Sequence, residues 1–293
     1  FKPFFTIIIT QNMMKTKRKN SELGYYLAGL IEGDGNIWTP LGLTRRYNPK
    51  IMFTFSKNEI PLFLCIKNIL GSGGFYYSKT DNCSRYTVSK KDTLIQLINL
   101  INGKFRTPKI EYLYKAIDYI NIKYHTNIPK LPLDKSNIFS NAWLAGITDA
   151  DGCFHIALGG NYKTINTTNK GRIICSFTLK QRMIDKSLNL SCIPFMINIA
   201  NSFLCNINYK KENAIAFVVQ ANSKHYLVKN YFTKFPLMSS KYLNYLSYLE
   251  GLNYLGKRLT NKEIIKVQMI KNSMNNKRTY YNWEHLKMFY KGD

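Results

Sequence analysis

The chain is poor in acidic residues and rich in basic ones. Its 293 residues include 17 Asp and Glu against 42 Lys and Arg, which gives a formal net charge of +25. Such an excess is typical of a protein that binds a phosphate backbone. A membrane surface would also attract it, but the basic residues are scattered along both halves of the chain rather than gathered on one amphipathic helix. We therefore expect a nucleic acid as the partner.

The chain also lacks the cysteine and histidine clusters that hold zinc. Its six cysteines contain no Cys-x-x-Cys pair and lie mostly in apolar stretches, so reduced, buried thiols are expected. Its four histidines, at positions 125, 155, 225 and 285, are too dispersed for a metal cluster or for an HNH-type nuclease site. A zinc site is therefore not expected.

No apolar run approaches the roughly 20 residues that a membrane span needs. Near the N-terminus a short apolar segment, residues 4–10, precedes a basic one, residues 14–20, which is the reverse of the order in a secretory signal. We expect residues 1–20 to be a flexible lead-in and the protein to have no membrane partner.

What the chain does contain is a repeat of an acid-ended segment. Leu27-Ala-Gly-Leu-Ile-Glu-Gly-Asp34-Gly35 returns 117 positions later (151 minus 34) as Leu144-Ala-Gly-Ile-Thr-Asp-Ala-Asp151-Gly152. Apolar residues recur at helical spacing in both copies, and each copy ends at Asp-Gly. The pattern predicts two short helices, with Ser21 and Ser140 as N-caps.

Small residues stand four apart in each predicted helix, namely Gly29 with Gly33 and Gly146 with Ala150. This spacing places them on one helix face, which another backbone can approach closely. The second copy is the obvious partner. Packing the two helices side by side would bring Asp34 and Asp151 together at the same end of the pair.

Two adjacent carboxylates at helix C-termini repel each other and the negative end of the helix dipole. A divalent cation between them removes both penalties, and Mg²⁺ commonly binds one or two carboxylates with water and phosphate oxygens. The plainer interpretation is that Asp34 and Asp151 merely begin Asp-Gly turns. Two copies with matching small-residue faces favour the metal site.

The motif pair resembles that of the LAGLIDADG homing endonucleases, in particular the single-chain, two-motif type similar to mitochondrial intron-encoded endonucleases and maturases. The resemblance runs from about Ser21 into the C-terminal tail. It implies that Asp34 and Asp151, with the backbone carbonyls of Gly33 and Ala150, bind Mg²⁺, or Mn²⁺, or Ca²⁺ in a non-cleaving complex. Glu32 and Asp149 point to another side of the helix, so a structural role in capping or ion pairing is expected.

The resemblance also implies polar and basic residues around the metals that position water and stabilise phosphate charge. By register these are Lys57 and Gln181 at the ends of matching strands, and Lys109 and Lys241 after the last helix of each repeat. For each of the lysines, the plainer alternative is a surface residue near a helix start.

Behind each motif the same elements recur, and Phe53-Thr-Phe-Ser-Lys57 matches Phe177-Thr-Leu-Lys-Gln181. The expected fold is α+β, with two pseudo-twofold-related αββαββα domains that form a DNA-binding saddle and pack their motif helices at the interface. The segment 126–137 carries two prolines and predicts an extended linker. The predicted divisions are a lead-in at 1–20, domains at 21–125 and 138–255, the linker at 126–137, and a basic C-terminal extension at 256–293.

Strands expose alternate side chains, so one face of each sheet can pack on helices while the other meets a DNA groove. Basic residues in and beside these strands are the candidate DNA contacts, although each one alone could equally be a solvated surface charge. They are Arg45, Arg46, Lys50, Lys79, Arg85, Lys163, Arg172, Lys180 and Arg182.

Together these features predict a metal-dependent DNA endonuclease with a long, asymmetric target, and the family resemblance implies that its double-strand break is staggered. The expected partner is double-stranded DNA, with the protein a monomer that carries internal pseudo-dimer symmetry. Mitochondrial location follows from the resemblance and from a composition expected of A/T-rich coding. The main alternative is an RNA maturase that assists splicing of its own intron, alone or besides cleavage, and a DNA-binding regulator is a third. Two retained acids favour the nuclease.

Overall fold

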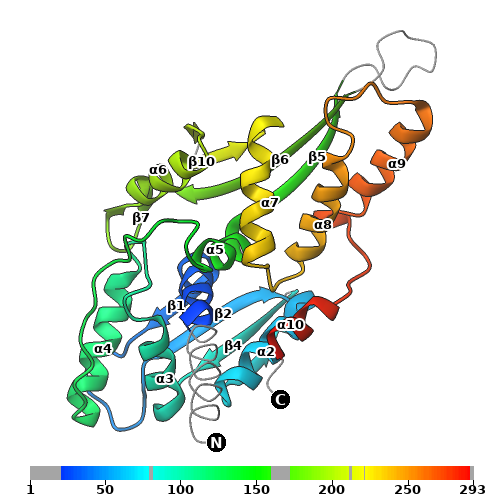
Figure 1. The fold of residues 1–293 in the computed structure, drawn as a ribbon. Coiled ribbons are helices and arrows are strands. Elements are labelled where there is room, and N and C mark those ends of the chain that lie inside the picture. The colour runs from blue at the N-terminus through cyan, green and yellow to red at the C-terminus, as the bar shows by residue number, and fades with distance from the viewer. Residues whose placement is uncertain (1–20, 79–81, 160–171, 211–212, 221, 291–293) are drawn as a thin grey trace, which may run out of the picture. The chain divides into compact units, whose positions relative to one another are not determined.

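The computed structural model describes residues 21–78, 82–159, 172–210, 213–220 and 222–290. The chain divides into two compact units. Unit 1 comprises the described parts of residues 1–55 and 67–150, and unit 2 those of residues 56–66 and 151–293. Figure 1 shows the helices and strands of both units, which are taken separately below.

Unit 1 is built on an antiparallel sheet of strand order β1-β2-β4-β3. A first motif helix covers residues 21–34 and runs directly into β1, where Gly35 pairs with Phe53 and Trp38 with Lys50. The elements are the first motif helix, β1 (Gly35–Trp38), β2 (Lys50–Ser56), the C-terminal part of α2 (Ile60–Leu70), β3 (Gly74–Tyr77), β4 (Cys83–Val88), α3 (Lys91–Ile101), α4 (Ile110–Tyr124) and α5 (Trp143–Asp151) as far as residue 150.

One face of this sheet forms the core of unit 1. Burial alternates along β1 and β4, with Ile37, Tyr86 and Val88 buried between more exposed neighbours. Helix α3 contributes Leu94, Leu97, Ile98 and Ile101, which are fully buried and follow the helical repeat. The other face of the sheet stays open.

Unit 2 repeats this plan with strand order β5-β6-β10-β9. Its core is a cluster of five phenylalanines whose ring centroids lie 5.1 to 5.8 Å apart in contacting pairs: Phe154, Phe177, Phe203, Phe217 and Phe232. The elements after η1 (Lys57–Glu59) and the start of α2 are β5 (Gly152–Gly159), β6 (Arg172–Arg182), β7 (Ile184–Asp185), β8 (Leu190–Ser191), α6 (Ile193–Ser202), β9 (Ile207–Lys210), β10 (Ala214–Val219), η2 (Asn222–Lys224), α7 (His225–Lys234), α8 (Lys241–Leu252), α9 (Asn261–Asn272), η3 (Asn275–Lys277), η4 (Glu284–Leu286) and α10 (Lys287–Tyr290).

The predicted α+β class and the doubled αββαββα order are confirmed. Helices α4 and α8, which follow each repeat, and the β7-β8 hairpin were not predicted. Helix α4 carries Ile110, Leu113, Ile117 and Ile120 at helical spacing and buries all four, so its periodicity was a usable signal. The C-terminal extension contains α9, which begins with a capping box between Thr260 and Glu263.

Three local predictions were wrong. Ser21 already lies within the first motif helix, and Ser140 precedes α5 without capping it, because the Asn141 side chain accepts the Trp143 N–H instead. All six cysteines are free, but Cys153 is exposed rather than buried, since it lies on the open face of β5.

The segment 126–137 forms no helix or strand, and hydrogen bonds tie it to the rest of unit 1. Asn102 donates to the Pro129 carbonyl at 2.6 Å and accepts the Leu131 N–H at 3.2 Å. Asn121 donates to the Ile128 carbonyl and accepts the Ile128 N–H, both at 2.9 Å.

Within the part of the chain that the structure describes, no helix is long and apolar enough to cross a membrane.

Candidate functional site

The two motif helices contact each other through backbone, at the small residues that the repeat predicted. A Cβ atom added to Gly29 would lie 2.1 Å from the Trp143 carbonyl oxygen, and one added to Gly146 would lie 1.9 Å from the Tyr26 carbonyl oxygen. No real side chain tolerates such distances. Only glycine at these two positions therefore permits the observed approach.

A matched pair of hydrogen bonds joins the same helices. The Tyr26 hydroxyl donates to the Asp149 carboxylate at 2.7 Å, and the Trp143 indole N–H donates to the Glu32 carboxylate. Tyr26 and Trp143 occupy equivalent positions in the two copies, as do Glu32 and Asp149, so each helix supplies one donor and one acceptor. The earlier acids of the motifs are thus buried acceptors between helices. Their predicted structural role is confirmed, and they fill it by accepting hydrogen bonds from neutral donors.

Glu32 is also tied to the segment ahead of α4. Its carboxylate accepts the backbone N–H groups of Arg106, at 2.8 Å, and of Thr107, at 2.5 Å. Complete burial raises the pKa of Glu32 to about 7, because removing the carboxylate from water outweighs the hydrogen bonds that favour its charged form. Glu32 is therefore a buried acid that titrates near neutrality.

This shift makes stability depend on pH in a defined direction. The folded-state pKa of about 7 exceeds the ordinary value of 4.5, so the folded protein binds more protons than the unfolded chain between these limits. The contribution of Glu32 to the free energy of unfolding is complete below about pH 4.5 and is lost as pH rises through about 7. Relative to a Glu32→Gln variant, the wild type should lose on the order of 2 kcal/mol of unfolding free energy between pH 5 and pH 8.

Urea denaturation of both proteins at the two pH values measures this difference. The substituted glutamine keeps the size of the side chain and one acceptor oxygen but does not titrate, so a lower stability of the variant at both pH values leaves the comparison intact. Parallel pH profiles for the two proteins would contradict the assignment of Glu32.

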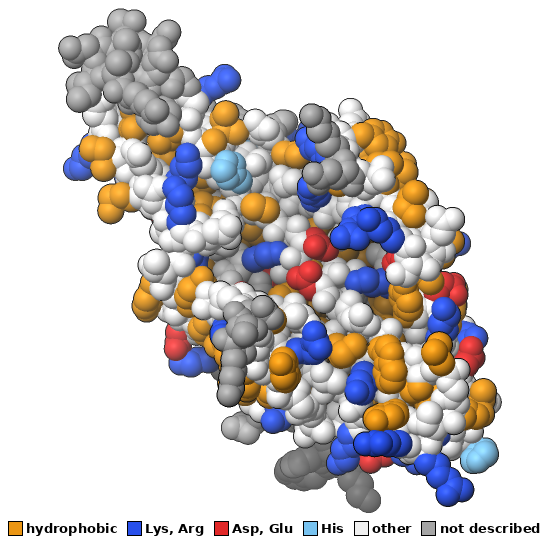
Figure 2. All heavy atoms as spheres, turned by 180° about the vertical axis from the view of Figure 1, so that it is seen from behind, with side chains coloured by type: hydrophobic (Ala, Val, Ile, Leu, Met, Phe, Trp, Pro, Cys, Tyr) orange, Lys and Arg blue, Asp and Glu red, His pale blue; other side chains and the backbone are white. Residues whose placement is uncertain are grey.

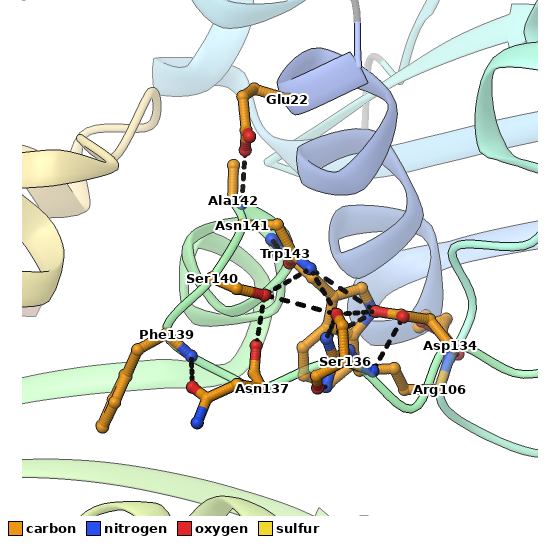
Figure 3. Close-up of polar contacts among 11 residues, drawn as sticks. Glu22, Arg106, Asp134, Ser136, Asn137, Phe139, Ser140, Asn141, Ala142 and Trp143 are labelled. Atoms are coloured by element: carbon orange, nitrogen blue, oxygen red, sulfur yellow. Dashed lines mark hydrogen bonds and ion pairs between the residues drawn. The ribbon is translucent and has the colours of Figure 1, made fainter. Parts of the chain in front are cut away.

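A polar network fixes the start of α5 (Figure 3). The Glu22 carboxylate accepts the Ala142 N–H at 2.9 Å, and the Asn141 side chain accepts the Trp143 N–H at 3.1 Å. Arg106 forms a buried ion pair with Asp134, at 2.5 Å, and donates to the Ser136 carbonyl at 2.8 Å. The network joins residues from the first motif helix, from the segment before α4 and from residues 126–137, and so orients α5 within unit 1.

Lys109 binds the C-terminal end of the first motif helix. Its ammonium donates to the carbonyl oxygens of Ile31 at 3.1 Å, Gly33 at 2.8 Å and Gly35 at 2.9 Å. The Ile31 and Gly33 carbonyls lie at the negative end of the helix dipole, which a cation stabilises, and the Gly35 carbonyl belongs to the first residue of β1. The arrangement brings Lys109 to the turn that presents Asp34, whose side chain is exposed. Lys109 was predicted as a site residue, but its hydrogen bonds to three backbone carbonyls were not predicted.

In unit 2 the Gln181 amide donates to the Asp151 carboxylate, so these two predicted residues lie in contact. Lys241 is the first residue of α8, and its positive charge lowers the pKa of the Cys153 thiol in β5. Surrounding atoms remove part of this exposed residue's thiol from water, and that desolvation is the larger effect, so the pKa is raised. Lys57 begins η1, directly after β2. Unit 2 therefore gathers Asp151, Gln181 and Lys241 around the start of β5.

Most predicted DNA contacts lie on or beside the open sheet faces. In unit 1, Arg45 and Arg46 are exposed in the loop between β1 and β2, and the exposed Arg85 donates to Thr54 of the neighbouring strand at 3.3 Å. In unit 2 the exposed residues Arg172, Lys180 and Arg182 fall on one side of β6. Basic side chains far outnumber acidic ones on the face shown in Figure 2. Lys50 is half-buried at the start of β2, while Lys79 and Lys163 lie outside the described residues.

The donor set suits a hard cation bound by few protein ligands. Among the described residues no group of three or more His, Cys, Asp or Glu side chains could form a complete protein cage for a metal. Asp34 and Asp151 are the last residues of their helices. Asp34 is exposed and Asp151 is half-buried. Carboxylates that leave room for water and phosphate oxygens fit the coordination habits of Mg²⁺.

Comparison with known proteins gives a consistent result. A family model described as "LAGLIDADG endonuclease" matches residues 27–123 and 144–252. The intron-encoded DNA endonuclease aI3 of Saccharomyces cerevisiae is 30% identical over 324 residues, covering 95% of this chain and 77% of the relative.

Two solved structures share the fold. The LAGLIDADG meganuclease I-AabMI bound to uncleaved DNA matches with a TM-score of 0.67 and 20% identity, covering 86% of this chain and 99% of that one. I-SmaMI, bound to its uncleaved DNA target in the presence of calcium ions, matches with a TM-score of 0.59 and 16% identity, covering 86% of this chain and 98% of that one.

Proposed function

Because the chain belongs to the LAGLIDADG endonuclease family, we propose that it is a site-specific DNA endonuclease that makes a staggered double-strand break in a long, asymmetric target. The observation that carries this proposal is the close pairing of two acid-ended motif helices through Gly29 and Gly146. A pure binding protein has no need to keep two acids at the ends of such helices. Here both Asp34 and Asp151 are present.

In this proposal Asp34 and Asp151 hold Mg²⁺ or another divalent cation, assisted by the backbone carbonyls of Gly33 and Ala150. The bound ions would polarise the scissile phosphate, lower the pKa of an attacking water and stabilise the leaving 3′ oxygen. The chain's own contribution is to position and direct the carboxylates. Lys109 supports this in unit 1 by neutralising the end of the helix that carries Asp34.

Gln181 plays the corresponding part in unit 2. Its amide donates to one oxygen of Asp151, which orients the carboxylate. We propose that Lys241 and Lys57 act as further positive groups that stabilise phosphate charge. All four residues are positioning or charge-stabilising groups in this proposal, and the acids carry the metals.

The open faces of the two sheets are proposed to bind DNA. Arg45, Arg46, Lys50 and Arg85 would serve one half-site, and Arg172, Lys180 and Arg182 the other. Sheet strands present such side chains to the major groove, where Arg and Lys recognise guanine and neutralise phosphates. The two sets differ in number and spacing, which supports an asymmetric target.

Since one chain carries both motif copies, we propose that it acts as a monomer. A mitochondrial location is supported by similarity to an intron-encoded relative and by the A/T-rich coding that the composition suggests. Binding to its own intron RNA remains the alternative activity on the same scaffold.

Incubation of the chain with Mg²⁺ and a plasmid that spans the intron-insertion sequence tests the proposal. We expect a linear product with staggered ends, and no product when the metal is chelated. A protein that binds this DNA without ever cutting it, and that accelerates splicing of the intron RNA, would instead be a maturase.

A further inference from the structure

The loop between β1 and β2, residues 39–49, exposes apolar side chains that no core or helix of the described chain covers. Leu41 is 110% exposed and Leu43 is 59% exposed, while Trp38 and Tyr47 at the two ends of the loop are 42% and 43% exposed. Clustered exposed apolar residues are typical of a binding surface rather than of a solvated loop. This surface is called the loop 39–49 surface below.

Helix α4 holds the second half of this loop, residues 44–48, in place. The Tyr119 hydroxyl accepts the Thr44 N–H at 3.0 Å and donates to the Tyr47 carbonyl at 3.0 Å. Lys123 donates to the Tyr47 carbonyl and to the Asn48 side chain, both at 2.8 Å. Helix α4 thus anchors the loop directly beside Leu41 and Leu43, whose side chains are exposed. A preorganised surface of this kind binds with less loss of conformational entropy.

The charge around the apolar residues identifies a polyanion as the partner. The Arg46 guanidinium lies 5.2 Å from the Tyr47 ring centroid, and the Lys50 ammonium lies 5.4 Å from that of Trp38. Arg45 is exposed beside them, and the sequence between Asp34 and Glu59 contains no acidic residue. Trp38 and Lys50 are paired on the open side of the sheet, so the loop continues the proposed DNA-binding face.

Duplex DNA offers one apolar group to such a surface. Its base faces are stacked on each other, and the 5-methyl group of thymine is the apolar feature of the major-groove edge. Leucine matches this methyl group but cannot satisfy the amino group of cytosine at the same site, which it would desolvate. Aliphatic rather than aromatic residues at the loop tip favour methyl contact over stacking with unpaired bases.

We propose that Leu41 and Leu43 recognise thymine methyl groups at the outer end of one half-site, beyond the bases read by the strands. This inference rests on the proposed DNA-binding function and adds the base and the residues that select it. Arg45 and Arg46 would hold the neighbouring phosphates and so set the depth at which the leucines meet the groove.

Selection of bound duplexes from a randomised DNA library tests the proposal. We expect the wild type to select thymine at one or two positions near one end of its target. A Leu41→Ser/Leu43→Ser variant should lose that preference there alone and bind the wild-type target about ten-fold more weakly. The matched control is Leu133→Ser, which changes a leucine that is 38% exposed in the segment 126–137. All three proteins should melt at similar temperatures, because the changed side chains are exposed.

Synthetic targets with deoxyuridine at these positions supply the second arm. Removing each methyl group should weaken wild-type binding about three- to five-fold and leave the double variant unaffected. An unchanged thymine preference in the double variant, or equal wild-type affinity for the two bases, would overturn the inference. So would a selective loss of single-stranded RNA binding by the variant, which would assign the loop to RNA. If the wild type selects no duplex at all, the proposed function itself fails.

Discussion

Replacement of Asp34 or Asp151 by asparagine should abolish double-strand cleavage and leave DNA binding intact. Asparagine preserves the size of the side chain and one oxygen ligand but removes the negative charge that a hard divalent cation requires. A metal contributes several kcal/mol to stabilising a phosphoryl transition state, and each 1.4 kcal/mol corresponds to a tenfold change in rate. We therefore expect the cleavage rate to fall at least about 100-fold.

Binding should survive because each substitution removes a negative charge from a protein that carries a net charge of +25. Linearisation of a target plasmid measures cleavage, and gel shift in Ca²⁺ measures binding to the same site. Asp118→Asn is the matched control. Asp118 lies on α4, is exposed, and forms an ion pair with Lys130. If either motif variant linearises the plasmid within tenfold of the wild-type rate, the metal assignment of that aspartate is wrong.

The second large effect is expected at the helix contact. Gly146→Ala and Gly29→Ala each place a methyl group about 2 Å from a backbone carbonyl oxygen of the other motif helix, so the two helices must separate. Overpacking of a well-packed core commonly costs 1 to 3 kcal/mol, and a clash with backbone lies at or above the upper end of that range. We expect about 3 kcal/mol or more of destabilisation for each variant, with cleavage lost as well because the proposed metal-binding ends of the helices move.

Denaturant unfolding of the variants measures this cost. Gly74→Ala is the matched control, because a Cβ at Gly74 would meet nothing within 4 Å. A Gly146→Ala protein that unfolds within about 0.5 kcal/mol of the wild type would show that the helices do not rely on this contact. Loss of cleavage without loss of stability would instead indicate that the helix spacing matters for the site alone.

Much of the fold could be predicted because it repeats and because its patterns are local. The equivalence of Asp34 and Asp151, the small residues Gly29 and Gly146, and the strand behind each motif all follow from spacing along the chain. Periods of 2 and 3.6 residues report which side chains share a face, whatever the rest of the chain does. These features determined the α+β class, the doubled plan and the candidate acids.

Other features depended on where distant segments meet. The sequence placed Glu32 and Asp149 outside the metal site but gave no sign that Tyr26 and Trp143 would bond them across the helix pair. A comparison of the two copies could have found this, because Tyr26 and Trp143 stand at the same position in the two motifs, as do Glu32 and Asp149. The N-cap of α5 was missed because Asn141 competes with Ser140 for the same helix start, and only the local chain path decides which side chain reaches the N–H.

The sequence by itself determined the repeat, the two acid-ended helices, the strands and the basic character that together indicate a DNA endonuclease. Tertiary structure alone decided that Lys109 binds three carbonyls at the end of the first motif helix, that Glu32 lies buried with a pKa near neutrality, and that α4 holds loop 39–49 with its leucines exposed. Periodic patterns are encoded by neighbouring residues and can be read locally. These contacts join residues about 75 positions apart, and their energies depend on burial and dielectric surroundings that exist only once the chain has folded.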